Sequence, residues 1–147
     1  MCFILYLREI YSSLDVDIVY PFEDDLREVF DLFGFKKEGR YFIQDELRIV
    51  IEIPSSTLSG DENRVETVEF ENGLYCKIIG IEDLLIDRVN ACKYGNSKID
   101  CEMAQLLSLK YGDQIDWNYM LKKAEEPQND IAKEIEQLRK KSNEEKS

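Results

Sequence analysis

The segment Leu14-Asp15-Val16-Asp17-Ile18-Val19-Tyr20 is the stretch from which we predict both a central strand and a candidate site. Its β-branched and aromatic residues predict a strand, which two aspartates interrupt. Asp15 and Asp17 are two residues apart, so on a strand both carboxylates project from one face, opposite Val16 and Ile18. Neighbouring acids raise each other's pKa, and a divalent cation such as Mg²⁺ removes that conflict. The alternative is an edge strand whose polar face is simply solvated.

The next residues predict one helix. A proline and three acids open it at 21–25, and Gly34 is a suitable residue to follow its last turn. Phe35 is expected to pack back against this end. We expect the apolar stripe of this helix, over 21–33, to lie in the core; it consists of Phe22, Leu26, Val29, Phe30 and Phe33.

Strands are predicted next, over 40–43 and 47–53, joined by a polar turn around residues 44–46. In the second strand Leu47, Ile49, Ile51 and Ile53 alternate with Arg48, Val50 and Glu52. A hairpin is predicted over 65–79, because Asn72-Gly73 is a strong two-residue turn signal.

Past Gly80 the apolar period changes from two to 3.6, which predicts a helical region. A first helix is expected to start at Ile81 and end near Gly95. Ser97 is a suitable N-cap for a second helix, and Asp113 or Asp116 for a third. A thin last apolar stripe follows through Ile131, Ile135 and Leu138, and the charged tail from Arg139 onward is expected to fray.

Three segments together resemble the nucleotidyltransferase superfamily, most closely small relatives of the AbiEii/AbiGii-type nucleotidyltransferases. They are residues 12–19, with the Asp-x-Asp strand; residues 32–35, where a helix ends in Gly-Phe; and residues 82–91, of the form x-Asp-Leu-Leu-x-x-Arg-x-x-Ala. The resemblance implies an α+β fold with a small mixed sheet and packed helices over 1–79, and a helical subdomain over 80–147.

The resemblance also implies a function: Mg²⁺- or Mn²⁺-dependent transfer of a nucleotidyl group from an NTP to an acceptor. Asp15 and Asp17 would be catalytic metal ligands. In the superfamily a third carboxylate on a neighbouring strand completes the site, and Glu52 is the candidate, with Glu46 as a weaker one. The competing interpretation makes Glu52 an exposed edge residue paired with Arg48.

For the nucleotide phosphates the candidates are Ser12 and Ser13, at the start of the signature, and Arg88 and Lys93 on the later helix. The competing interpretation of Arg88 is an ion pair with Asp100. The family's Gly-Ser or Gly-Gly pair is expected at or before Met1 and does not occur in the sequence, so either it lies upstream or the chain lacks it.

Composition limits the partners. A formal net charge of −12 argues against nucleic acid, which needs clustered cations. With no histidine and no Cys-x-x-Cys pair among four cysteines, a zinc site and histidine catalysis are not expected, and the cysteines are predicted to be reduced thiols. We expect a cytoplasmic protein with no membrane span. The rival function is an inactive relative that binds a protein partner in a toxin–antitoxin type system, and a homodimer is also compatible.

Overall fold

A computed structural model of the chain describes residues 15–144, which form a mixed α+β protein with five helices and two small sheets. The chain divides into two compact units, the first ending at Ile79 and the second beginning at Gly80. Each unit is described by itself. Among the described helices, none has the length and apolar character that crossing a membrane requires.

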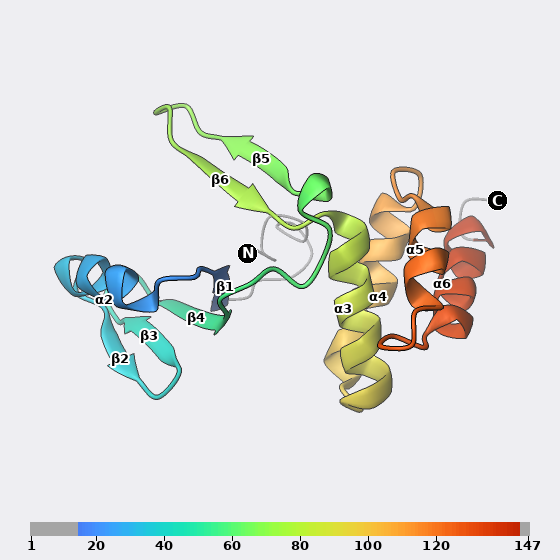
Figure 1. The fold of residues 1–147 in the computed structure, drawn as a ribbon, viewed down its shortest axis with the longest axis horizontal. Helices are drawn as coiled ribbons and strands as arrows, with labels where there is room; N and C mark the ends of the chain where they lie inside the picture. The colour runs from blue at the N-terminus through green and yellow to red at the C-terminus, as the bar shows by residue number, and fades with distance from the viewer. Residues whose placement is uncertain (1–14, 145–147) are drawn as a thin grey trace. The chain divides into compact units, whose positions relative to one another are not determined.

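A four-stranded sheet forms the centre of the first unit (Figure 1). Its order is β1 (Asp15–Val19), β4 (Ile49–Ser55), β3 (Tyr41–Gln44) and β2 (Lys36–Glu38). β1 runs parallel to β4, and the other two pairs are antiparallel. The sheet is therefore mixed, as the sequence predicts, and β2 is a strand that the sequence pattern did not predict.

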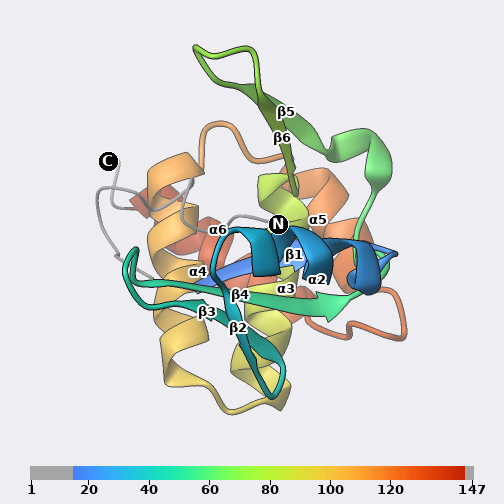
Figure 2. The same cartoon turned by 90° about the vertical axis from the view of Figure 1, so that its left-hand side faces the viewer.

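Helix α2 (Glu23–Leu32) packs on one face of this sheet, as Figure 2 shows. The core between them contains buried Phe30, Phe42 and Ile51, with partly buried Val16 and Ile18 against them. The expectation that the whole apolar stripe of α2 is buried was wrong. The exposed members are Phe22, at 61%, Val29, at 44%, and Phe33, at 68%. The core residues show the physical reason: the small sheet covers only the side of the helix that carries Leu26 and Phe30.

The end of α2 matches its prediction. Gly34 has a φ of +76°, and its N–H donates to the carbonyl of Asp31, while the N–H of Phe35 donates to the carbonyl of Phe30. These two bonds are a Schellman motif, which needs a residue that tolerates positive φ. The rings of Phe30 and Phe35 lie 5.2 Å apart, so the end of the helix is tied into the core.

β4 begins two residues later than predicted. Residues 45–48 form a turn in which Arg48 has a φ of 53°, a value that takes the backbone out of the extended region. Leu47 is consequently 64% exposed rather than part of the core. The remaining alternation holds, because Ile49, Ile51 and Ile53 all pack against the core cluster.

The predicted hairpin forms a separate two-stranded sheet of β5 (Glu66–Glu69) and β6 (Tyr75–Ile78), after a short 3-10 helix η1 (Glu62–Arg64). Gly73 takes a positive φ of 78°, and the Asn72 side chain accepts a hydrogen bond from the N–H of Leu74. Gly73 therefore supplies the positive φ as predicted. Asn72 does not take one, and the hydrogen bond from the N–H of Phe70 to the carbonyl of Leu74 closes a three-residue loop rather than a two-residue turn.

The second unit consists of four helices: α3 (Ile81–Tyr94), α4 (Lys98–Tyr111), α5 (Trp117–Ala124) and α6 (Ala132–Glu144). α3 packs on α4 and α5, and α6 packs on the same two helices. The predicted caps are present: Ser97 accepts from the N–H of Asp100, and Asp116 from the N–H of Tyr119. The expectation that the tail frays from residue 139 was wrong. α6 extends to Glu144, held where the buried Ser142 hydroxyl donates to the carbonyl of Ser108.

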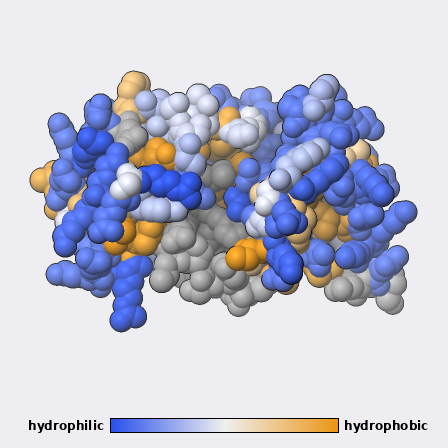
Figure 3. Space-filling model, turned by 90° about the horizontal axis from the view of Figure 1, so that it is seen from below, coloured by the Kyte–Doolittle hydropathy of each residue, from blue (hydrophilic) through white to orange (hydrophobic). Residues whose placement is uncertain are grey.

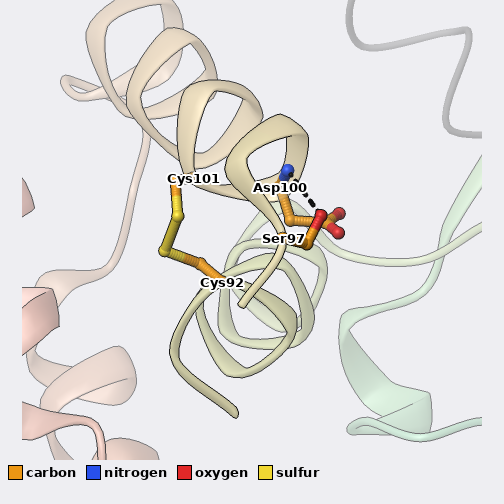
Figure 4. The surroundings of a disulfide bond; sticks show 4 residues. All are labelled: Cys92, Ser97, Asp100 and Cys101. Carbon is orange, nitrogen blue, oxygen red and sulfur yellow. Dashed lines mark hydrogen bonds between the residues drawn. A yellow bond between two sulfur atoms is a disulfide. The ribbon is translucent and has the colours of Figure 1, made fainter. Parts of the chain in front are cut away.

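The cysteines differ from expectation in one pair. Cys92, in the last turn of α3, and Cys101, in the first turn of α4, form a disulfide with a Cα–Cα distance of 4.8 Å (Figure 4). The prediction of reduced thiols was therefore wrong for these two. Nine residues separate them, but the tight reversal between the helices brings their backbones within bonding range, which sequence spacing alone did not reveal. Cys76 is a free thiol, and Cys2 lies outside the described residues.

Candidate functional site

The face of the sheet opposite α2 carries the predicted acids. Asp17 on β1 is the register partner of Glu52 on β4, and Glu52 is in turn the partner of Tyr41 on β3. Directly opposed residues on neighbouring strands project from the same face, about 5 Å apart. Asp17, Glu52 and Tyr41 therefore form a row across three strands, which we call the acid row.

Asp15 is the partner of Val50 in the same parallel pair, two residues before Asp17. Only its backbone is described. Glu46 lies in the exposed turn before β4, where its N–H donates to the side chain of Gln44. Ser12 and Ser13 lie outside the described residues.

Arg40 is a residue beside these acids that the sequence pattern did not indicate as part of a site. Its Nε lies 3.2 Å from Oε1 of Glu52, so the cation paired with Glu52 is Arg40 and not Arg48. A second guanidinium nitrogen donates to the hydroxyl of Tyr41 at 2.7 Å, and the guanidinium carbon lies 4.9 Å from the centre of that ring. Only 17% of the Glu52 side chain is exposed, against 68% for Arg40.

The surroundings of Arg40 favour its charged form. The hydrogen bond to Tyr41, followed by the charge of Glu52, raises the pKa of Arg40 above its ordinary value, and the charge of Asp17 acts in the same direction. Partial desolvation opposes these effects without cancelling them. The guanidinium thus sits in a negative field to which both acids of the row contribute. The signal for it was the register: once Tyr41 is opposite Glu52, its neighbour Arg40 is within reach.

The carboxylate oxygens of the acid row are suitable ligands for a hard divalent cation. Carboxylate oxygens are the ligands that Mg²⁺ takes, and Mg²⁺ is commonly held by one or two protein carboxylates together with substrate phosphates. Asp17 and Glu52 would supply two such groups. Within the described part of the chain, no three acidic or cysteine side chains are grouped closely enough to hold a metal ion by themselves. A metal at this face would therefore depend on further oxygen ligands from substrate or water.

Arg88, the predicted phosphate contact, is engaged inside the helical unit. Its two terminal nitrogens donate to Asp100 on α4 and to Asp87 on α3, both at 2.8 Å. Arg88 is 23% exposed and Asp100 17%. The ion pair with Asp100 that was the competing interpretation is thus present, on the helix whose first turn Ser97 caps.

Lys93 is also occupied within that unit. Its ammonium group donates to the backbone carbonyl of Asp130 and lies 3.4 Å from Oε2 of Glu134 on α6. Desolvation lowers the pKa of Lys93, but the hydrogen bond and charge of Glu134 outweigh it, so the pKa is raised. Tyr94 donates to carbonyls of the same loop, at Asn129 and Asp130. Both side chains fasten the loop between α5 and α6.

A cleft of about 660 Å³ opens in the first unit at the carboxyl ends of the two parallel strands. Its walls include Val19 and Tyr20 after β1, Ser56 and Thr57 after β4, and Lys77 on β6. Its volume is within the usual range of small-molecule sites, and the carboxyl ends of parallel strands are where such sites commonly lie. Asp17 precedes Val19 by two residues, or about 7 Å along the strand.

Comparison of the chain with models of protein families, with curated protein sequences and with solved structures finds no match in any of the three.

Proposed function

We propose that the acid row binds a divalent metal ion together with the phosphates of a nucleotide, and that the protein transfers a nucleotidyl group to an acceptor. The observation that carries the proposal is the register of β1 on β4, because it sets Asp17 beside Glu52 on one face of the sheet. Two adjacent carboxylates on one face attract a cation, and Mg²⁺ is a cation that carboxylate oxygens bind. The resemblance to nucleotidyltransferases in the sequence supports the same assignment.

In this reaction the protein's own groups have three tasks. Asp17 and Glu52 hold the metal, and either of them can accept the proton of the attacking hydroxyl. The cleft lined by Val19, two residues along β1 from Asp17, offers space for the acceptor. A bound metal would neutralise the phosphates of the NTP, while the acceptor oxygen would bond to the α-phosphorus and pyrophosphate would leave in line.

Metal-dependent stabilisation tests the proposal. Mn²⁺ that binds only the folded protein raises its melting temperature in proportion to site occupancy. We expect this rise in the wild type, and its loss in Asp17→Asn. Asp45→Asn is the matched control, because Asp45 is an exposed acid of the same unit that pairs with Lys36 in the turn before β4.

The transfer step is tested with an NTP labelled at the α-phosphate and Mn²⁺, followed by a search for label on protein or small molecules. Label that appears with wild type and Asp45→Asn but not with Asp17→Asn would support the reaction. A melting temperature that millimolar Mn²⁺ leaves unchanged in all three proteins would refute the proposed function.

The second candidate is a non-catalytic protein that binds a partner chain, and exposed apolar side chains of the first unit favour it. Leu32 is 85% exposed and Phe33 68% at the end of α2, while Leu74 and Tyr75 are exposed at the hairpin. Figure 3 shows hydrophobic patches among hydrophilic residues on one face of the molecule. If α2 is the contact between two copies, Leu32→Ser with Phe33→Ser should abolish self-association in sedimentation experiments. A monomer at all concentrations would exclude the homodimer.

A further inference from the structure

The position of Arg40 adds a specific element to the proposed function, on which this inference rests. A cation already occupies the carboxylate of Glu52, and it is the protein's own guanidinium, 3.2 Å away. A metal ion bound to this carboxylate would repel the guanidinium beside it. We therefore expect a metal at Glu52 to weaken the contact that Arg40 makes with this oxygen.

The exposure and the contacts of Arg40 favour its displacement from Glu52. It lies in the turn before β3, after Gly39; its side chain is 68% exposed, and it makes a single contact to Glu52 rather than a two-pronged one. The exposure of the arginine weakens such a pair, because solvent screens the guanidinium and the long side chain loses freedom in forming the contact. The other hydrogen bond of the Arg40 guanidinium goes to the hydroxyl of Tyr41. This bond can hold the guanidinium near the acid row after it leaves Glu52.

A released guanidinium beside two metal-binding acids is well suited to phosphate. Arginine presents a planar array of donors that matches phosphate oxygens and keeps its charge at all physiological pH values. In the second unit Arg88 and Lys93 are already bonded to acids and carbonyls, whereas Arg40 exchanges one anionic partner for another. We infer that Arg40 is an exchangeable counter-ion: it neutralises Glu52 when no metal is present and contacts the nucleotide phosphates when metal and nucleotide bind.

The inference predicts effects of opposite sign from one substitution. In Arg40→Gln the competitor for Glu52 is gone, so Mn²⁺ alone should bind about three- to tenfold more tightly. The phosphate contact is gone too, so the Mn²⁺ complex of α,β-methylene-ATP should bind about three- to tenfold more weakly. Free Mn²⁺ is measured by its electron paramagnetic resonance signal, and the nucleotide by calorimetry.

Two further variants make the test specific. Arg48→Gln removes the same charge from the exposed turn of the same sheet and should change neither affinity beyond a small general effect. Tyr41→Phe keeps Arg40 but removes the hydrogen bond that holds it near the acid row, so Mn²⁺ should bind more tightly and nucleotide affinity should fall less than in Arg40→Gln. Circular dichroism establishes that each variant is folded.

The outcomes separate this inference from the proposed function. Opposite shifts in Arg40→Gln, absent in Arg48→Gln, support the exchange. If Arg40→Gln leaves both affinities unchanged while Asp17→Asn abolishes Mn²⁺ binding, the metal site stands and the role of Arg40 is refuted. If both ligands bind more tightly, Arg40 only competes and does not contact phosphate. If none of the folded proteins binds Mn²⁺, the proposed function and the inference both fail.

Discussion

Arg40 in the first unit and Arg88 in the second both face acids, but with different geometry. Arg88 makes two contacts of 2.8 Å to carboxylates and is 23% exposed. Arg40 makes one contact of 3.2 Å to Glu52 and is 68% exposed. A partly buried arginine with two carboxylate partners is costly to remove, whereas an exposed one with one carboxylate and one hydroxyl partner costs less to move. The same residue type therefore fixes α3 to α4 and remains exchangeable on the sheet.

The two units also differ in how completely their side chains are buried. In the helical unit, side chains with no exposed surface include Leu84, Leu85 and Leu107, and even the acids Glu82 and Asp83 are buried. Oε1 of Glu82 accepts the N–H of Asp116, and Oδ1 of Asp83 accepts the hydroxyl of Tyr119, so the start of α3 holds the start of α5. In the described part of the first unit the buried apolar residues are fewer, and several aromatic side chains are exposed. The closely packed helical unit is suited to a structural role.

The largest expected effect tests this difference in packing. Leu85→Ala removes a side chain with no exposed surface from α3, and we expect a loss of about 3 kcal/mol in the free energy of unfolding. Leu32→Ala makes the same change at a residue of α2 that is 85% exposed, and should cost less than about 0.5 kcal/mol. Urea denaturation followed by circular dichroism measures both. Equal losses would contradict the contrast between the units.

A smaller effect compares the two arginines directly. Arg88→Gln leaves Asp100 partly buried without its cation, and we expect a loss of about 2 kcal/mol in the free energy of unfolding. Arg40→Gln should cost clearly less without metal, because Arg40 is itself 68% exposed, although Glu52 is as little exposed as Asp100. Both are measured by urea denaturation in a chelator. A large loss in Arg40→Gln would make Arg40 a structural residue and count against its exchange.

Much of the local structure could be predicted because single residues determine it. Gly34 and Gly73 adopt positive φ, Ser97 and Asp116 cap helices, and the change of period at Gly80 precedes α3. These features depend on neighbours in sequence, where spacing is informative. Burial of the α2 stripe could not be predicted, because it depends on how much of the helix the sheet covers.

For the candidate site, sequence spacing supplied the acids but not their cation. The strand pattern indicates Asp17 and Glu52 as candidate ligands. The position of Arg40 next to Glu52 depends on the register of β3 on β4, which the length of the turn at 45–48 determines. A turn shorter by two residues would set a different residue opposite Glu52. The disulfide was missed for a related reason, since the reversal between α3 and α4 exists only in the fold.

The smallest expected effect concerns Lys93 and its pH dependence. Its pKa is raised above the ordinary 10.5 in the folded protein, with Glu134 as the favourable partner. Stability from this contact is therefore complete below the ordinary pKa and is lost as the pH rises through the raised folded value. Lys93→Met should be less stable than wild type near neutral pH, and the gap should narrow above about pH 10.5. The readout is the urea midpoint at a series of pH values. Lys140→Met, at an exposed position of α6, is the control and should show no such narrowing. A gap that stays constant with pH would assign the role of Lys93 to packing of its stem and not to its charge.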